Sequence, residues 1–195
     1  FIVAMTSVTG SFEKALYESS RVLKVHGQIL PASVANLALS ASLADGSLVR
    51  GESAVAGRGS PIERIAIAPE DAPAFPRAVE AIGQAQLVVI GPGSLYTSIL
   101  PNLLVKGIAE ALSNTSATKV YVCNVATQRG ETDEYSVQAH VKALQSHTSR
   151  ELVDYVVTNS QTVELGPRFL GQPVENDGRP LEHAVLVGGD LVDRD

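Results

Sequence analysis

Cysteine, tryptophan and aromatic residues are scarce in this chain of 195 residues, which has one cysteine, no tryptophan and 5% aromatic residues. The single cysteine, Cys123, excludes an internal disulfide framework and is typical of a reducing compartment. With so few aromatic rings, the core must be built from valine, leucine, isoleucine and alanine. Hydrophobic residues still make up 45% and charged residues 18%, which is the composition of a folded globular domain.

Long apolar runs and clusters of positive charge are also missing. No apolar run reaches the roughly 18 residues of a membrane span, and no basic segment precedes the apolar residues 1–5 as a secretory signal requires. The net charge is -6, and lysine and arginine do not gather on a periodic face, so no nucleic-acid surface is expected. We therefore expect an intracellular protein with no membrane span and no nucleic-acid partner.

Four short apolar runs, about 30 residues apart, carry the fold prediction; they are 87–90, 120–123, 155–157 and 184–187. Helical spacing of apolar residues lies between them at 77–83, 103–112 and 135–145, and also at 12–23 near the start of the chain. Helix breakers bound the runs, and β-branched residues dominate them, which favours strands over a helical bundle. The sequence predicts an α/β domain whose parallel strands are covered on both faces.

The stretch from Leu37 to Ile67 has a different pattern, because apolar residues alternate along it. Asp45-Gly46 is a hairpin turn signal between two alternating segments, and residues 62–67 alternate again. This pattern predicts a small antiparallel addition to the sheet. The glycine-rich residues 57–61 are predicted to be a mobile connection.

The loop after the first run has the residues of a ligand-binding loop, and ligands bind beyond the carboxyl ends of strands in an open parallel sheet. Its residues are Gly91, Pro92, Gly93, Ser94, Leu95, Tyr96, Thr97 and Ser98. The glycines let the backbone approach a ligand, and the hydroxyls stand where a helix should begin and favour an anion such as phosphate. A serine-capped turn is the alternative. The loop is neither a P-loop nor a dinucleotide fingerprint.

A second polar loop, 124–133, follows the next run, and its amides and carboxylates should reach the same sheet edge. Asn124 and Gln128 are suited to read a base or a sugar. Glu131 and Asp133 are weak candidates for a metal ligand or general base; the alternative is that Asp133, or Thr132, caps the next helix. The third loop, Thr158-Asn159-Ser160, either touches the ligand or forms a turn.

The remaining reactive residues favour structural interpretations. Cys123 ends an apolar strand, which indicates packing, and His140 is predicted to be packed or at the surface. No His or Cys spacing resembles a zinc site. Arg50 and Glu52 pair either with each other or with a ligand.

Several of these segments closely resemble the YvcK-type branch, often called the gluconeogenesis factor family, of the CofD-like family. The most specific segment is Gly91-Pro92-Gly93-Ser94-Leu95-Tyr96-Thr97-Ser98-Ile99-Leu100-Pro101-Asn102-Leu103-Leu104. The others are Val120-Tyr121-Val122-Cys123-Asn124, Thr127-Gln128, Gly130-Glu131-Thr132-Asp133, Gly51-Glu52-Ser53 and Ile29-Leu30-Pro31.

The resemblance implies a Rossmann-like three-layer domain with a mostly parallel sheet. It also implies a cytoplasmic, regulatory protein that binds a UDP-sugar, notably UDP-N-acetylglucosamine, and is linked to cell shape, peptidoglycan synthesis and carbon metabolism. No catalytic residue is assigned, and a homodimer is plausible for the family. The expected ligand-binding residues are Gly91, Pro92, Gly93, Ser94, Leu95, Tyr96, Thr97, Ser98, Asn124, Thr127, Gln128 and Asn159.

The related transferases of coenzyme F420 synthesis are the alternative. They resemble this chain less, because they typically carry Gly-Pro-Ser-Asn-Pro where it has Gly91-Pro92-Gly93-Ser94-Leu95. They move a phospholactyl-type group from a nucleotide diphosphate donor to a deazaflavin with magnesium. In that case Glu131 or Asp133 would hold magnesium. An interaction module with a degenerate site is a third hypothesis.

The sequence departs from the family pattern in two ways. Members of the family begin with a strand and a Gly-Gly-Gly-Thr-Gly nucleotide loop, and this chain has neither. We therefore expect residues 1–195 to be a single domain of this family without that strand and loop. Members also commonly carry Asp before the residue that corresponds to His140, where this chain has Ala139, which weakens a metal or acid/base role there.

Overall fold

The computed structural model describes residues 1–24, 26–55, 60–149, 151–161, 166 and 169–191. Most of the predicted connection at 57–61 lies outside these residues. Among the described residues, no helix is both long enough and apolar enough to cross a bilayer.

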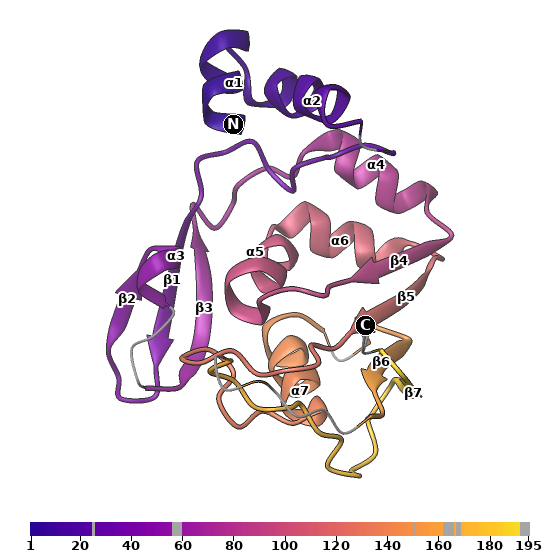
Figure 1. Cartoon of the computed structure of the whole chain (residues 1–195). Helices are drawn as coiled ribbons and strands as arrows, with labels where there is room; N and C mark the ends of the chain where they lie inside the picture. Colours follow the sequence, from indigo (N-terminus) through magenta and orange to yellow (C-terminus); the bar gives the residue numbers. More distant parts are fainter. Residues whose placement is uncertain (25, 56–59, 150, 162–165, 167–168, 192–195) are drawn as a thin grey trace.

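Two separate sheets form the framework (Figure 1). The larger sheet is parallel and has the order β4 (Leu87–Ile90), β5 (Thr118–Val122), β6 (Tyr155–Asn159) and β7 (Val185–Gly189). The smaller sheet is antiparallel and has the order β2 (Leu48–Arg50), β1 (Ala38–Leu43) and β3 (Ile62–Ala68). The α/β prediction is confirmed. The antiparallel part forms a sheet of its own in the described residues, because its strands pair with one another and not with β4 to β7.

Three predicted helices appear close to the expected positions, as α2 (Phe12–Val22), α4 (Pro76–Gln84) and α7 (Val137–His147). The helix predicted at 103–112 begins earlier and is divided into η1 (Leu95–Ile99), α5 (Leu100–Leu103) and α6 (Lys106–Asn114). The division occurs at Val105, whose backbone is extended with φ -66° and ψ 113°. A further short helix, α3 (Glu52–Val55), follows β2.

The first helix, α1 (Ile2–Thr9), was not predicted from the sequence. Its apolar residues do not gather on one face, and none of its side chains is buried, so the usual amphipathic signal is missing. Gly10 ends the helix in the left-handed region at φ 70°, where glycine is the least strained residue.

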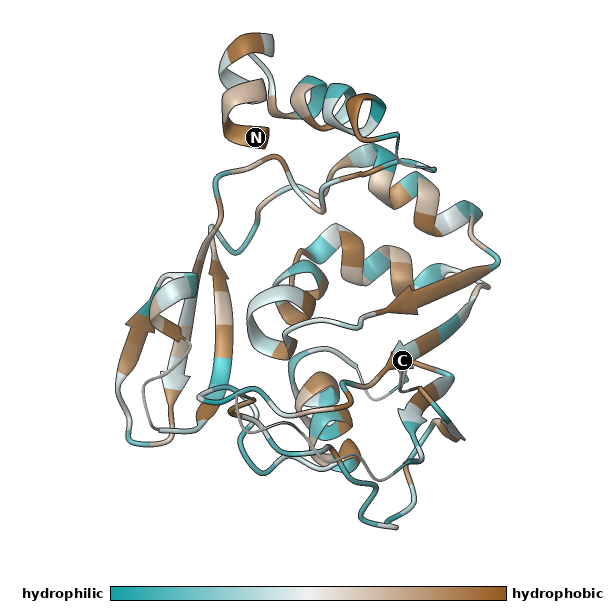
Figure 2. Ribbon diagram, viewed as in Figure 1, coloured by the Kyte–Doolittle hydropathy of each residue, from teal (hydrophilic) through white to brown (hydrophobic). Residues whose placement is uncertain are grey.

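The core lies between the two sheets, where α5, α6 and α7 are found (Figure 1). The strand face toward these helices is buried and includes Ile90, Tyr121 and Val156. The opposite face is open in the described residues: the exposed fraction is 56% at Leu87 and 56% at Val185. Figure 2 shows that the β4 ribbon is hydrophobic in composition. Within the described residues, the predicted cover is therefore not seen over these side chains of the second face.

Candidate functional site

The loops after β4 and β5 contact each other directly. The side chain of Asn124 accepts a hydrogen bond from the backbone N–H of Gly93 at 3.3 Å and donates one to the carbonyl of the same residue at 2.9 Å. Neighbouring parallel strands end at the same edge of a sheet, so residues 31 positions apart meet there. Both functional groups of Asn124 are engaged with the backbone, so this side chain positions the loop.

A hollow opens beside this contact, at the carboxyl ends of β4 and β5. Its lining residues are Pro92, Gly93, Ser94, Val122, Cys123, Asn124, Val125, Ala126, Gln128, Phe169 and Leu191. Five of the expected ligand-binding residues are among them, namely Pro92, Gly93, Ser94, Asn124 and Gln128. The other seven are not among its lining residues.

Ser94 connects the two loops through its hydroxyl. It donates to Oε1 of Gln128 at 2.8 Å and also contacts Oε1 of Glu131 at 3.2 Å. The same Glu131 oxygen accepts from the hydroxyl of Thr97 at 3.3 Å. Glu131 is only 7% exposed, and its second oxygen, Oε2, is buried without a hydrogen-bond partner in the described structure. A buried carboxylate therefore stands directly behind the first loop.

Leu95 and Tyr96 point into the core and do not line the hollow. The hydroxyl of Tyr96 lies 2.8 Å from that of Tyr135, and the two rings meet edge to face. Burial, followed by this hydrogen bond, raises the pKa of Tyr96 far above its usual range. Tyr96 supports the loop from beneath, as a neutral phenol.

Two further expected residues hold neighbouring segments against the hollow. Thr127 is buried and exchanges two hydrogen bonds of 2.8 Å with the backbone of Gln172. Asn159 donates to the carbonyl of Gln161 at 2.7 Å and accepts from the backbone of Leu191 at 3.3 Å. Their side chains shape the walls that Phe169 and Leu191 form.

Gly91 needs to be glycine for a steric reason. Its φ is +85°, and a Cβ at this position would lie 3.0 Å from the carbonyl of Val122 and 3.2 Å from Ile99. Ser98, at the end of the expected set, is exposed, and its carbonyl accepts from Nδ2 of Asn102 at 2.6 Å.

Six lining residues of the hollow were not among the expected ligand-binding residues: Val122, Cys123, Val125, Ala126, Phe169 and Leu191. Phe169 is 52% exposed and follows no periodic pattern, since it belongs to the irregular connection between β6 and β7. The bridge between Ala126 and Pro173 brings this connection beside the second loop. Only tertiary contacts reveal this wall, so periodicity gives no signal for it.

The thiol and the imidazole near the site are packed. Cys123 is buried, and desolvation raises its pKa to about 12, so the thiol stays protonated and unreactive. His140 is fully buried; burial lowers its pKa, and Nδ1 lies 2.9 Å from the carbonyl of Ser136. The structural interpretation of both residues is confirmed.

His147 joins α7 to the smaller sheet. Its Nε2 accepts a buried hydrogen bond from the backbone N–H of Ile65 in β3 at 3.1 Å, while Nδ1 lies 2.8 Å from the carbonyl of Ala143. Burial lowers its pKa, which is the direction expected for a neutral ring that accepts through one nitrogen.

The cap of α7 differs from the prediction. Ser136 is the N-cap, and its side chain accepts from the backbone N–H of Ala139 at 3.2 Å. Asp133 and Thr132, the predicted caps, instead close the preceding turn: they accept from the backbone N–H of Gly130 at 2.6 Å and of Gln128 at 2.9 Å.

The described residues contain no ready-made cluster of protein ligands for a metal ion. No group of three or more His, Cys, Asp or Glu is found among them, Glu131 does not line the hollow, and Asp133 is exposed and engaged in its turn. Arg50 and Glu52 form no ion pair within the described structure.

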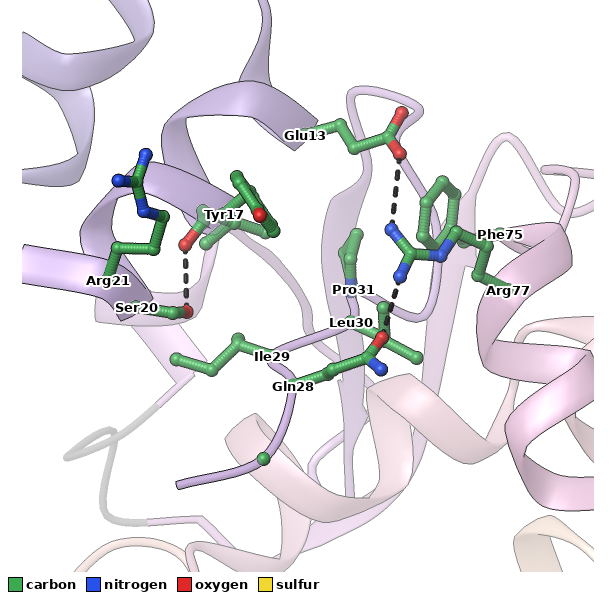
Figure 3. Close-up of a pocket in the computed structure, with 12 residues that line it drawn as sticks. Glu13, Tyr17, Ser20, Arg21, Gln28, Ile29, Leu30, Pro31, Phe75 and Arg77 are labelled. Carbon is green, nitrogen blue, oxygen red and sulfur yellow. Dashed lines mark hydrogen bonds and ion pairs between the residues drawn. The ribbon is translucent and has the colours of Figure 1, made fainter. Parts of the chain in front are cut away.

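A second hollow lies between α2 and α4 (Figure 3). The guanidinium of Arg77 donates to Oε1 of Gln28 at 2.6 Å and lies 3.7 Å from Oε1 of Glu13. The Ile29-Leu30-Pro31 segment lines its apolar side. These contacts join the α1 and α2 pair to the rest of the molecule, so we interpret this hollow as a packing seam.

The comparisons with known proteins agree on one family. Residues 1–184 match the family model described as 2-phospho-L-lactate transferase CofD. The gluconeogenesis factor of Bacillus subtilis is 46% identical over 162 residues, which are 83% of this chain and 51% of the relative. The gluconeogenesis factor of Listeria innocua is 41% identical over 184 residues, which are 93% of this chain and 57% of the relative.

A solved structure has the same fold. A Bacillus halodurans protein, described as a member of the UPF0052 family, is 37% identical with a TM-score of 0.87, over 96% of this chain and 63% of that chain. This chain spans about half the length of the curated relatives it matches. The chain belongs to the CofD family, in the branch whose curated members are named gluconeogenesis factors.

Proposed function

We propose that the hollow beyond β4 and β5 binds a nucleotide sugar of the UDP-N-acetylglucosamine type. The protein then acts by binding and not by turnover, as a cytoplasmic regulator linked to cell shape, peptidoglycan synthesis and carbon metabolism. The resemblance of the sequence to the gluconeogenesis factor branch supports the choice of ligand.

One observation carries the proposal: the hollow has one polar and one apolar wall. Ser94 and Gln128 contribute hydroxyl and amide groups from two loops, and Val125, Phe169 and Leu191 contribute apolar surface on the other side. A nucleotide sugar has a planar base and a hydroxyl-rich sugar, and sites for such ligands combine apolar walls with a few fixed polar groups.

Binding is favoured over catalysis by the state of the thiol and the imidazole nearest to the hollow. The thiol of Cys123 is buried with a raised pKa, and the imidazole of His140 is enclosed in the core. Neither group is available as a nucleophile or a general base for a ligand in the hollow.

Titration calorimetry of the full-length protein with UDP-N-acetylglucosamine, with and without magnesium, tests the proposal. Phe169→Ala should weaken binding at least tenfold, because stacking of a base on an aromatic ring contributes roughly 1–3 kcal/mol and 1.4 kcal/mol is a tenfold change. Leu170→Ala is the matched control, since Leu170 is next in the chain, exposed, and not part of the hollow. If the two variants bind the ligand with equal affinity, the ligand does not contact Phe169 and binds elsewhere.

The alternative is a transferase, and the description of the matching family model favours it. Incubation with a nucleotide diphosphate-linked donor, magnesium and a deazaflavin acceptor separates the two functions. A transferred product would establish the transferase, whereas saturable binding without product supports the regulator. No binding at millimolar ligand would favour an interaction module.

A further inference from the structure

The turn that carries Glu131 fixes its carboxylate behind the first loop. The backbone N–H groups of Glu131 and Thr132 both donate to the carbonyl of Gln128, at 3.0 and 2.9 Å. The hydroxyl of Thr132 accepts from the N–H of Gln128 in return, at 2.9 Å. Because these bonds close the turn on itself, the Glu131 side chain is directed inward and remains almost completely buried.

The carboxylate determines the direction of the nearby hydroxyl groups. Each hydroxyl has a single proton, and Ser94 donates its proton toward Gln128 and Glu131, while Thr97 donates toward Glu131. Of the two, only Ser94 lines the hollow, and what remains on its oxygen for a ligand is lone pairs. At Ser94, the hollow therefore presents a hydrogen-bond acceptor, although a serine at a loop and helix start suggests a donor.

The charges around the wall point in the same direction. The described lining residues include no lysine or arginine, and no described cation forms an ion pair with Glu131. A phosphate beside Ser94 would meet lone pairs and a negative charge in a partly desolvated place, whereas a hydroxyl or amide N–H would find complementary acceptors.

We propose that Glu131 is a specificity-determining residue that makes the 91–98 loop accept the hydroxyl- or amide-bearing part of the ligand and exclude its diphosphate. The residue acts through Ser94 and Thr97, so it is a positioning residue. This proposal rests on the proposed function for the identity of the ligand. It replaces the sequence-based expectation that the loop hydroxyls hold phosphate.

Glu131→Gln removes the charge at nearly constant shape, and Glu134→Gln is the matched control. Glu134 is three residues further along the chain, exposed, and outside the hollow, so its substitution changes the net charge equally. Titration calorimetry with two probes, inorganic pyrophosphate and UDP-N-acetylglucosamine, measures the selectivity. We expect Glu131→Gln to bind pyrophosphate at least tenfold more tightly than Glu134→Gln does, and UDP-N-acetylglucosamine at least tenfold more weakly.

The two proposals fail in different ways. If the unmodified protein does not bind UDP-N-acetylglucosamine, the proposed function fails, while the pyrophosphate comparison still decides the role of Glu131. Equal pyrophosphate affinity of the two variants overturns that role. If Glu131→Gln does not fold, Ser94→Ala serves instead. This variant should bind UDP-N-acetylglucosamine at least tenfold more weakly and should not bind pyrophosphate more tightly. Unchanged affinity for UDP-N-acetylglucosamine overturns the proposal.

Discussion

The two faces of the parallel sheet are both apolar in sequence but differ in their surroundings. Tyr121 and Val156, paired across β5 and β6, are fully buried against the helices. Tyr155 and Val185, paired across β6 and β7 on the other face, are 40% and 56% exposed. An apolar run therefore identifies a strand of a parallel sheet. It does not show which face of that strand is buried against the described helices. Substitutions on matched residues measure how different the faces are in solution.

The largest effect is expected for the two tyrosines of neighbouring strands. Tyr121→Ala should lower the free energy of unfolding by about 3–5 kcal/mol, because it removes a fully buried ring and leaves a cavity. Tyr155→Ala, on the open face, should cost less than about 1 kcal/mol. Urea unfolding followed by circular dichroism measures both. If both variants lose the same stability, the open face is covered in solution.

A smaller loss of stability is expected at the contact between α7, on the buried face of the parallel sheet, and the smaller sheet. His147→Leu leaves the buried N–H of Ile65 without its acceptor, which should cost about 1–3 kcal/mol. His26→Leu is the control, because His26 is exposed. The same urea titration gives both values, and an unchanged midpoint for His147→Leu would mean that this hydrogen bond contributes nothing to stability.

The two buried histidines of α7 should also make the stability of the protein depend on pH. Burial lowers the pKa of His140 and His147 below the usual 6.5, so the unfolded chain takes up protons first as the pH falls. Their contribution to stability is therefore fully present above pH 6.5 and is lost as the pH falls from there toward the folded pKa. The urea midpoint of unfolding should be lower at pH 5.5 than at pH 7.5. This difference should be smaller in His147→Leu than in the unmodified protein. A midpoint that rises on acidification would contradict this.

The smallest change in stability is expected on the open face itself. Val89→Lys should alter the free energy of unfolding by less than about 0.5 kcal/mol, because the side chain is already half exposed. It should, however, reduce self-association, since exposed apolar patches promote contact between molecules. Light scattering over a concentration series tests this, with Lys106→Gln on an exposed helix position as the variant that should have no effect.

The sequence predicts the framework well because strands and amphipathic helices have periodic signals. It does not predict the break at Val105, which depends on how α5 and α6 pack, or α1, which lacks an amphipathic face. At the candidate site, the meeting of Gly93 and Asn124 follows from adjacent parallel strands. The apolar wall around Phe169 and the direction of the Ser94 hydroxyl depend on contacts between distant segments, and local patterns carry no information about either.

The double hydrogen bond between Asn124 and the backbone of Gly93 joins two strand-end loops into a single rigid unit. A rigid rim loses little conformational entropy when a ligand arrives, which favours affinity without new contacts. It also means that a ligand touching one loop acts on a segment that is hydrogen-bonded to the other. Any signal that binding sends through this edge of the sheet would thus reach β4 and β5 together.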